Sequence, residues 1–159
     1  MDFEKLVVKR RTIRKYTNEP VEREMLVKLI DYARLAPYGA NMQPLKFAIA
    51  DDANTAERIF AQTKWSAYHP EDAPKASEQP PAYIAILADT TVKKGSCDVE
   101  LGTAGAYIVL GAADMGLSTC WLGAINKEKI HDILGLPEHL QVLNIIAVGH
   151  SEQKSSVEE

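Results

Sequence analysis

A cluster of positive charges near the start of the chain is the first feature that could do chemistry. Residues 10–15 read Arg-Arg-Thr-Ile-Arg-Lys, whereas the 159-residue chain as a whole has a formal net charge of −4. A local cluster on an acidic background indicates one discrete anion rather than a nucleic-acid surface. Arginine suits a phosphate because its planar group donates two parallel hydrogen bonds. The alternative is a run of solvated charged side chains that follows a helix and binds no anion, which would have the same composition.

A second candidate is the segment Pro37-Tyr38-Gly39-Ala40-Asn41-Met42-Gln43-Pro44, which joins a helical pattern to an expected strand. Its prolines restrict the backbone, and its two amide side chains each offer donors and an acceptor. Such a loop could bind the edge of a planar heterocycle that is rich in carbonyls and ring nitrogens. The alternative is an ordinary connection whose amides satisfy its own backbone.

The third segment runs from Asp98 to Gly123 and reads DVELGTAGAYIVLGAADMGLSTCWLG. It predicts a helix over 98–115 that is rich in glycine and alanine, a stop at Gly116 and a strand over 118–122. Small side chains permit close approach of backbones. We therefore expect this helix to lie centrally in the molecule or at a subunit interface.

Hydrophobic spacing predicts the other elements that must position these segments. We expect helices over 2–9, from Glu19 to Ala36, over about 54–63 and from Asn126 to Gly135. We expect strands over 47–50, 82–88 and 141–148, and the run over 82–88 is apolar enough to be buried on both faces. Residues 64–81 are expected to form a long loop with one helical turn.

Length and composition indicate a single domain over residues 1–150, followed by a polar, frayed tail over 151–159. No apolar run approaches the roughly 20 residues that cross a bilayer, and the first residues lack the apolar region of a secretory signal. We therefore expect a cytoplasmic protein with no membrane partner. Cys97 and Cys120 lack metal-site spacing and the four histidines are scattered, so we expect no metal, two reduced thiols and a buried Cys120.

The order of the motifs "RRTIRKYT", "PYGANMQP" and the helix-strand run ending in "GLSTCWLG" resembles the nitroreductase family of flavoproteins. The resemblance covers nearly the whole chain and implies an α+β fold. In this fold a central mixed, mostly antiparallel sheet is flanked by helices, and two chains form an intertwined homodimer with FMN at the interface. It also implies that hydride passes from NADH or NADPH through flavin N5 to a nitroaromatic, a quinone or a similar small acceptor in ping-pong order.

The resemblance assigns the cationic segment to the cofactor. Arg10 and Arg11 would hold the phosphate or the ribityl chain, with help from the Thr12 hydroxyl. Arg14 would lie beside the pyrimidine edge of the flavin, where a fixed cation favours the reduced form.

The resemblance also assigns two backbone segments. The partner subunit would contribute Pro37, Tyr38 and Gly39 near the ring or the phosphate, and the flavin edge would be bound by Asn41 and Gln43. The backbone at Leu122 and Gly123 would donate to flavin N5. No catalytic side chain is needed, because the cofactor carries the chemistry.

Two departures from the family pattern affect the prediction. The tail HSEQKSSVEE offers only Lys154 where relatives place basic residues for the phosphate. The chain is also a short member, with residues 64–81 alone to cover the site. We expect an open site with Trp65 and Tyr68 as lid aromatics, unless they anchor the loop to the core. A flavin-binding sensor or carrier with little turnover, and specialised chemistry such as dehalogenation, stay open as alternatives.

Overall fold

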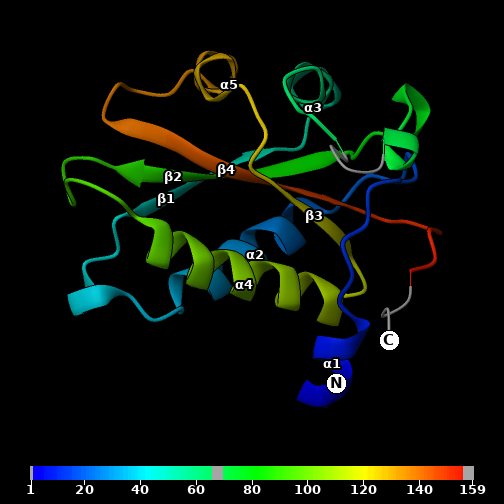
Figure 1. Ribbon diagram of the computed structural model, residues 1–159, viewed down its shortest axis with the longest axis horizontal. Coiled ribbons are helices and arrows are strands. Elements are labelled where there is room, and N and C mark those ends of the chain that lie inside the picture. Colours follow the sequence, from blue (N-terminus) through cyan, green and yellow to red (C-terminus); the bar gives the residue numbers. More distant parts are fainter. Residues whose placement is uncertain (1, 66–69, 156–159) are drawn as a thin grey trace.

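A four-stranded sheet with the strand order β1-β2-β4-β3 forms the centre of the molecule (Figure 1). The computed structural model describes residues 2–65 and 70–155. The strands are β1 (Leu45–Ala50), β2 (Ala82–Asp89), β3 (Ser118–Leu122) and β4 (Leu140–Gly149). All three strand pairs are antiparallel. The expectation of a mixed sheet was wrong for these strands, and the parallel contact in the described part of the chain is an isolated bridge between Thr12 and Thr119.

Helices cover both faces of this sheet, as the α+β prediction required. The helices are α1 (Phe3–Lys9), α2 (Arg23–Arg34), α3 (Ala53–Phe60), α4 (Asp98–Asp114) and α5 (Lys127–Leu134). Figure 1 shows α2 and α4 on one face and α3 and α5 on the other. None of the helices in the described ranges has the length and apolar character needed to cross a membrane.

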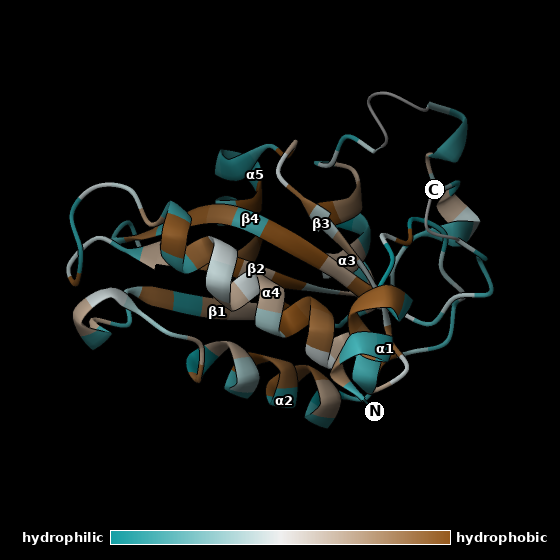
Figure 2. Ribbon diagram, turned by 60° about the horizontal axis from the view of Figure 1, so that its bottom comes forward, coloured by the Kyte–Doolittle hydropathy of each residue, from teal (hydrophilic) through white to brown (hydrophobic). Residues whose placement is uncertain are grey.

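The central strand β2 is buried along its whole length, as its apolar sequence predicted. Because successive side chains of a strand point to opposite faces of the sheet, β2 contributes side chains to two apolar clusters. Ile84 and Ile86 join the cluster beneath α2 and α4, while Tyr83 and Leu87 join the cluster beneath α3 and α5. Figure 2 shows largely brown, apolar strands, and teal, polar surface on α5 and on parts of α2. The sheet therefore lies between two apolar layers.

Helix α4 lies centrally against the sheet and α2, which confirms one of the two positions expected for it. Its small residues are required where neighbouring rings approach. A Cβ atom placed at Gly111 would lie 2.5 Å from Cδ2 of Tyr32, closer than real atoms come. The glycine-rich sequence therefore reflects close packing on this side of the helix.

Local signals set most helix ends. The side chains of Asp52 and Asn126 cap α3 and α5 by accepting from backbone N–H groups three residues later. Gly135 ends α5 in the left-handed conformation, with φ of 60°. The expected start of α2 at Glu19 was wrong. Glu22 has extended dihedrals and serves as the N-cap, so the chain before it stays extended.

The segments expected to be irregular contain more order than the sequence predicted. Residues 64–81 include two short 3₁₀ turns, Pro70–Asp72 and Ala76–Glu78, rather than one helical turn. The start of the tail is not frayed, because residues 150–153 are hydrogen-bonded to residues 14–17. Cys97 and Cys120 are free and buried, and Cys120 lies in β3 as predicted.

Candidate functional site

A pocket with strongly positive walls lies beside the C-terminal end of α4. Its volume is about 540 Å³, and four cationic side chains line it: Lys9, Arg10, Arg11 and Lys154. Hydroxyl and amide side chains line much of the remainder, and no carboxylate occurs among its described lining residues. Positive charge combined with neutral hydrogen-bonding groups suits a phosphate. The residues present therefore fit the phosphate end of a mononucleotide.

The arginine charges of this region are not neutralised within the described chain. The ion pairs among residues 2–65 and 70–155 include neither Arg10, Arg11 nor Arg14. Arg11 donates from Nε to the carbonyl oxygen of Arg10 at 2.7 Å, which orients the stem of its side chain. The guanidinium groups therefore keep donors available for an anion.

The cationic segment attaches to the free edge of the sheet. Strand β3 is an edge strand, and the Ile13 N–H donates to the Thr119 carbonyl at 2.9 Å. Together with the Thr12–Thr119 bridge, this contact ties residues 12 and 13 to the start of β3, directly before Arg14. Burial raises the pKa of the Cys120 thiol to about 11, and the nearby Arg14 charge opposes that rise. The Arg14 charge is therefore felt at Cys120.

Gly123 lies at the other end of the same edge. The backbone N–H and C=O groups of alternate residues point to the same side of a strand. Those of Trp121 therefore point away from β4, as those of Thr119 do, and Gly123 continues this row. The Gly123 N–H has no hydrogen-bond partner within the described part of the chain. One edge thus presents cations at its start and a free backbone donor at its end.

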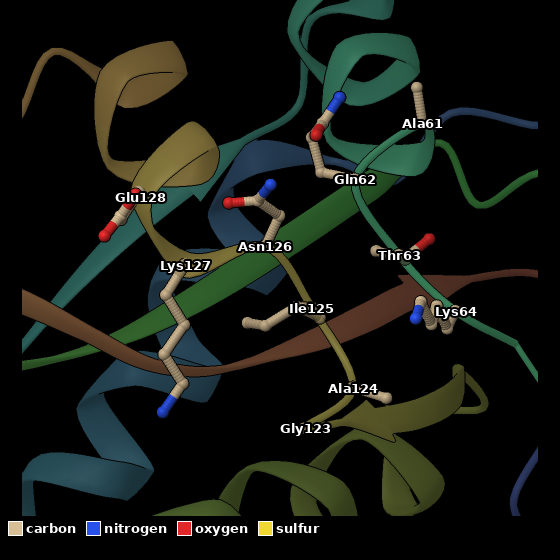
Figure 3. Close-up of a pocket in the computed structure, with 10 residues that line it drawn as sticks. All are labelled: Ala61, Gln62, Thr63, Lys64, Gly123, Ala124, Ile125, Asn126, Lys127 and Glu128. Atoms are coloured by element: carbon tan, nitrogen blue, oxygen red, sulfur yellow. The ribbon is translucent and has the colours of Figure 1, made fainter.

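A second and larger pocket opens at Gly123. It measures about 760 Å³ and lies between residues 61–64 and 123–128 (Figure 3). The Lys64 N–H donates to the Ala124 carbonyl and the Asn126 N–H donates to the Gln62 carbonyl, both at 2.9 Å. Sequence reasoning missed residues 62–64, because no local pattern shows that the end of α3 pairs with the turn after β3.

The loop over residues 37–43 is strained. Positive φ angles, between 49° and 51°, occur at Ala40, Asn41 and Gln43. Residues other than glycine seldom adopt this conformation. Such strain gathers at binding sites. The Tyr38 hydroxyl donates to the Ala33 carbonyl at 2.9 Å, so it is engaged within its own chain. The loop therefore holds its amide side chains, which are exposed, in a constrained backbone.

This loop and the cationic pocket lie at opposite ends of α4. The Thr103 hydroxyl reaches the Pro37 carbonyl at 3.4 Å, whereas Ala113, Gly116 and Arg10 line the cationic pocket. Seventeen helical residues span about 25 Å. Figure 1 shows the same separation, with residues 37–43 in cyan at one side and the N-terminal segment in blue at the other. One chain does not bring the two motifs together.

Comparison with known protein families identifies the family of this chain. The model of the family described as "Nitroreductase family" matches residues 7–150. This chain is a member of the nitroreductase family. That membership confirms the resemblance carried by the three motifs.

Individual proteins are similar to this family member in sequence or structure over nearly its full length. It is 26% identical over 157 residues to an Archaeoglobus fulgidus protein named as an NADH dehydrogenase/NAD(P)H nitroreductase, covering 94% of this chain and 86% of the other. An FMN-dependent nitroreductase from Clostridium difficile superposes with a TM-score of 0.77 at 27% identity, covering 97% and 90% of the chains. A Desulfovibrio desulfuricans protein solved in complex with FMN gives a TM-score of 0.79 at 25% identity, covering 100% and 92%.

The expected lid aromatics divide between described and undescribed residues of this nitroreductase-family chain. The ring of Trp65 lies 5.9 Å from that of Phe60 and packs against the core beneath α3 and α5. This contact is the one expected of a loop anchor. Tyr68 lies outside the described residues.

Proposed function

We propose that this protein is an FMN-dependent NAD(P)H oxidoreductase that reduces a nitroaromatic, a quinone or a similar small acceptor in ping-pong order. When bound, FMN supplies the hydride chemistry at N5. The observation that carries the proposal is the edge of β3, which joins a phosphate-suited pocket at one end to the free Gly123 N–H at the other. The protein's own residues would bind the cofactor, orient it and polarise its ring system.

The cationic pocket would hold the phosphate. Arg10 and Arg11 supply permanently charged donors, and Lys154 adds a third cation from the tail. Thr12 is exposed next to them. Lys154 is the one lysine or arginine of the tail, and its place in the pocket lining supports a role in binding the phosphate.

Two groups outside the lining of the phosphate pocket, Arg14 and the Gly123 N–H, would act on the ring system. Arg14 places a positive charge near Cys120, where it would stabilise negative charge that develops during reduction. The Gly123 N–H, next to Leu122, would donate a hydrogen bond without introducing a titrating group. The pocket beside Gly123 offers room for a reductant or an acceptor, with Gln62 and Lys64 as polar walls.

A homodimer would complete the site. The partner's copy of the 37–43 loop could reach the cationic pocket that a chain's own loop cannot. Exposed apolar side chains on α1 and α4 support such pairing, since Phe3 is 69% exposed and Val99 76% exposed. An apolar groove of about 520 Å³ lies between α1, α2 and α4, with Tyr107 in its wall. Surfaces of this kind mark interaction sites.

The deciding experiment is a visible absorption spectrum after mixing with FMN and desalting, followed by anaerobic addition of NADH or NADPH. Retained flavin that bleaches would support the oxidoreductase. Retained flavin that neither reductant bleaches would favour a sensor or carrier. Absence of retained flavin would overturn the proposal. Turnover with halogenated phenols and nitroaromatics would then separate dehalogenation from nitroreduction.

A further inference from the structure

Five consecutive backbone N–H groups, those of residues 13–17, are each held by a distant part of the chain. Those of Ile13, Tyr16 and Thr17 donate to backbone carbonyls of Thr119, Glu78 and His150, each at 2.9 Å. The two between them are held differently. Arg14 N–H and Lys15 N–H both donate to a single side-chain oxygen, Oε1 of Gln153, each at 3.0 Å. Gln153 therefore connects the tail to the segment that carries Arg14.

A second contact fixes the turn of the tail. The Ser151 hydroxyl donates to the Lys15 carbonyl and accepts from the Gln153 N–H, the latter at 3.0 Å. The tail thus returns toward β3 in a defined conformation, although it belongs to no helix or strand. Lys154 follows directly and enters the pocket that contains Arg10 and Arg11. Its flexible side chain would be dispersed in solvent if the tail were free.

We propose that Gln153 is a positioning residue for cofactor affinity: its side-chain oxygen clamps the tail so that Lys154 lies beside the phosphate. This inference rests on the proposed binding of FMN in the cationic pocket. The clamp acts through Lys154 and not through general stability. Its loss should therefore affect ligands that carry a phosphate and spare those that do not.

The test compares FMN with riboflavin, which has the same ring system but no phosphate. Dissociation constants are measured by flavin fluorescence for wild type, Gln153→Met, Lys154→Ala and the double variant. Methionine keeps the length of glutamine but lacks the amide oxygen. We expect Gln153→Met and Lys154→Ala each to weaken FMN binding about tenfold. The double variant should be no weaker than Lys154→Ala alone, because the clamp has nothing left to position.

Controls separate this mechanism from misfolding. Glu152→Gln changes the exposed neighbour and should leave both dissociation constants unchanged. Amide hydrogen exchange of Arg14 and Lys15 should accelerate in Gln153→Met, which would show that the clamp has opened. Amides that stay protected would contradict the inference, because the N–H groups would then have another acceptor.

The remaining outcomes are distinct. Equal weakening of riboflavin and FMN would overturn the inference, since Gln153 would then act on the ring site or on the fold. Additive losses in the double variant, or unchanged FMN affinity with an open clamp, would overturn it too. If wild type binds neither flavin, the proposed function itself fails, and the inference fails with it.

Discussion

The indole ring of Trp121 occupies the space that a side chain at position 105 would need. A Cβ atom placed at Gly105 would lie 2.0 Å from Cη2 of Trp121 and 2.3 Å from Cζ3. The ring is rigid and packs between α4 and the sheet, so it cannot move away as a flexible chain end could. This contact sets the distance between α4 and β3, and β3 carries the candidate site.

Gly105→Ala should therefore destabilise the protein, although alanine favours helices. We expect a loss of about 1–3 kcal/mol in the free energy of unfolding, because the ring or the helix must shift. Gly102→Ala in the same helix is the matched control. A Cβ atom there meets nothing within 4 Å, so we expect a gain of about 0.5–1 kcal/mol. Urea unfolding of both variants measures the difference, and equal effects would contradict the packing described for Trp121.

The two ends of the cationic segment should have separable roles. Arg10→Ala should weaken FMN binding by about 1.5–3 kcal/mol, because it removes a charge-assisted contact in the phosphate pocket. Arg14→Ala should instead lower the midpoint potential of the bound flavin, and this effect should exceed its effect on the binding of oxidised FMN. Fluorescence titration and spectroelectrochemistry measure the two quantities. Equal effects of both substitutions on both quantities would show that this division of roles is wrong.

The ion pair at the start of α4 should make stability sensitive to acid. Lys93 Nζ lies 2.6 Å from Oε1 of Glu100, and this hydrogen bond holds the pKa of Glu100 below its ordinary value of 4.5. A lowered pKa contributes stability above that ordinary value, and the contribution is lost as pH falls through the folded-state pKa. Glu100→Gln should therefore be less stable than wild type at pH 7, and the gap should narrow below about pH 4.5.

Thermal unfolding from pH 7 to pH 3 measures this gap. Glu57→Gln on the exposed side of α3 serves as the matched control, and its stability should change with pH as that of wild type does. A gap that stays constant on acidification would mean that Glu100 contributes by packing rather than by its charge.

Both thiols should be unreactive in the folded protein. Burial raises the pKa of Cys120 to about 11 and also raises that of Cys97, so neither forms much thiolate at pH 8. Iodoacetamide should label neither residue under native conditions at pH 8, and both in urea, as measured by mass spectrometry. Native labelling of Cys120 would indicate that the β3 edge opens readily.

Local physics explains what the sequence alone determined. The apolar run from Ala82 to Ala88 predicts a strand buried on both faces, because it is short and follows two prolines, which favours a strand over a buried helix. Asn126 and Gly135 bound α5 because a capping oxygen and a left-handed residue act within one turn. The three ordered motifs were sufficient to indicate the family, which the family comparison confirms.

Only the tertiary structure decided which of these residues meet. Helix α2 begins at Arg23 and not at the expected Glu19. Val21, which precedes it, packs into the core outside the helix. Lys154 and Arg10 line one pocket although they are far apart in the sequence, and the 37–43 loop is kept from them by the length of α4. Contacts between residues far apart in the chain depend on strand order and helix packing, and no local pattern of side chains encodes them.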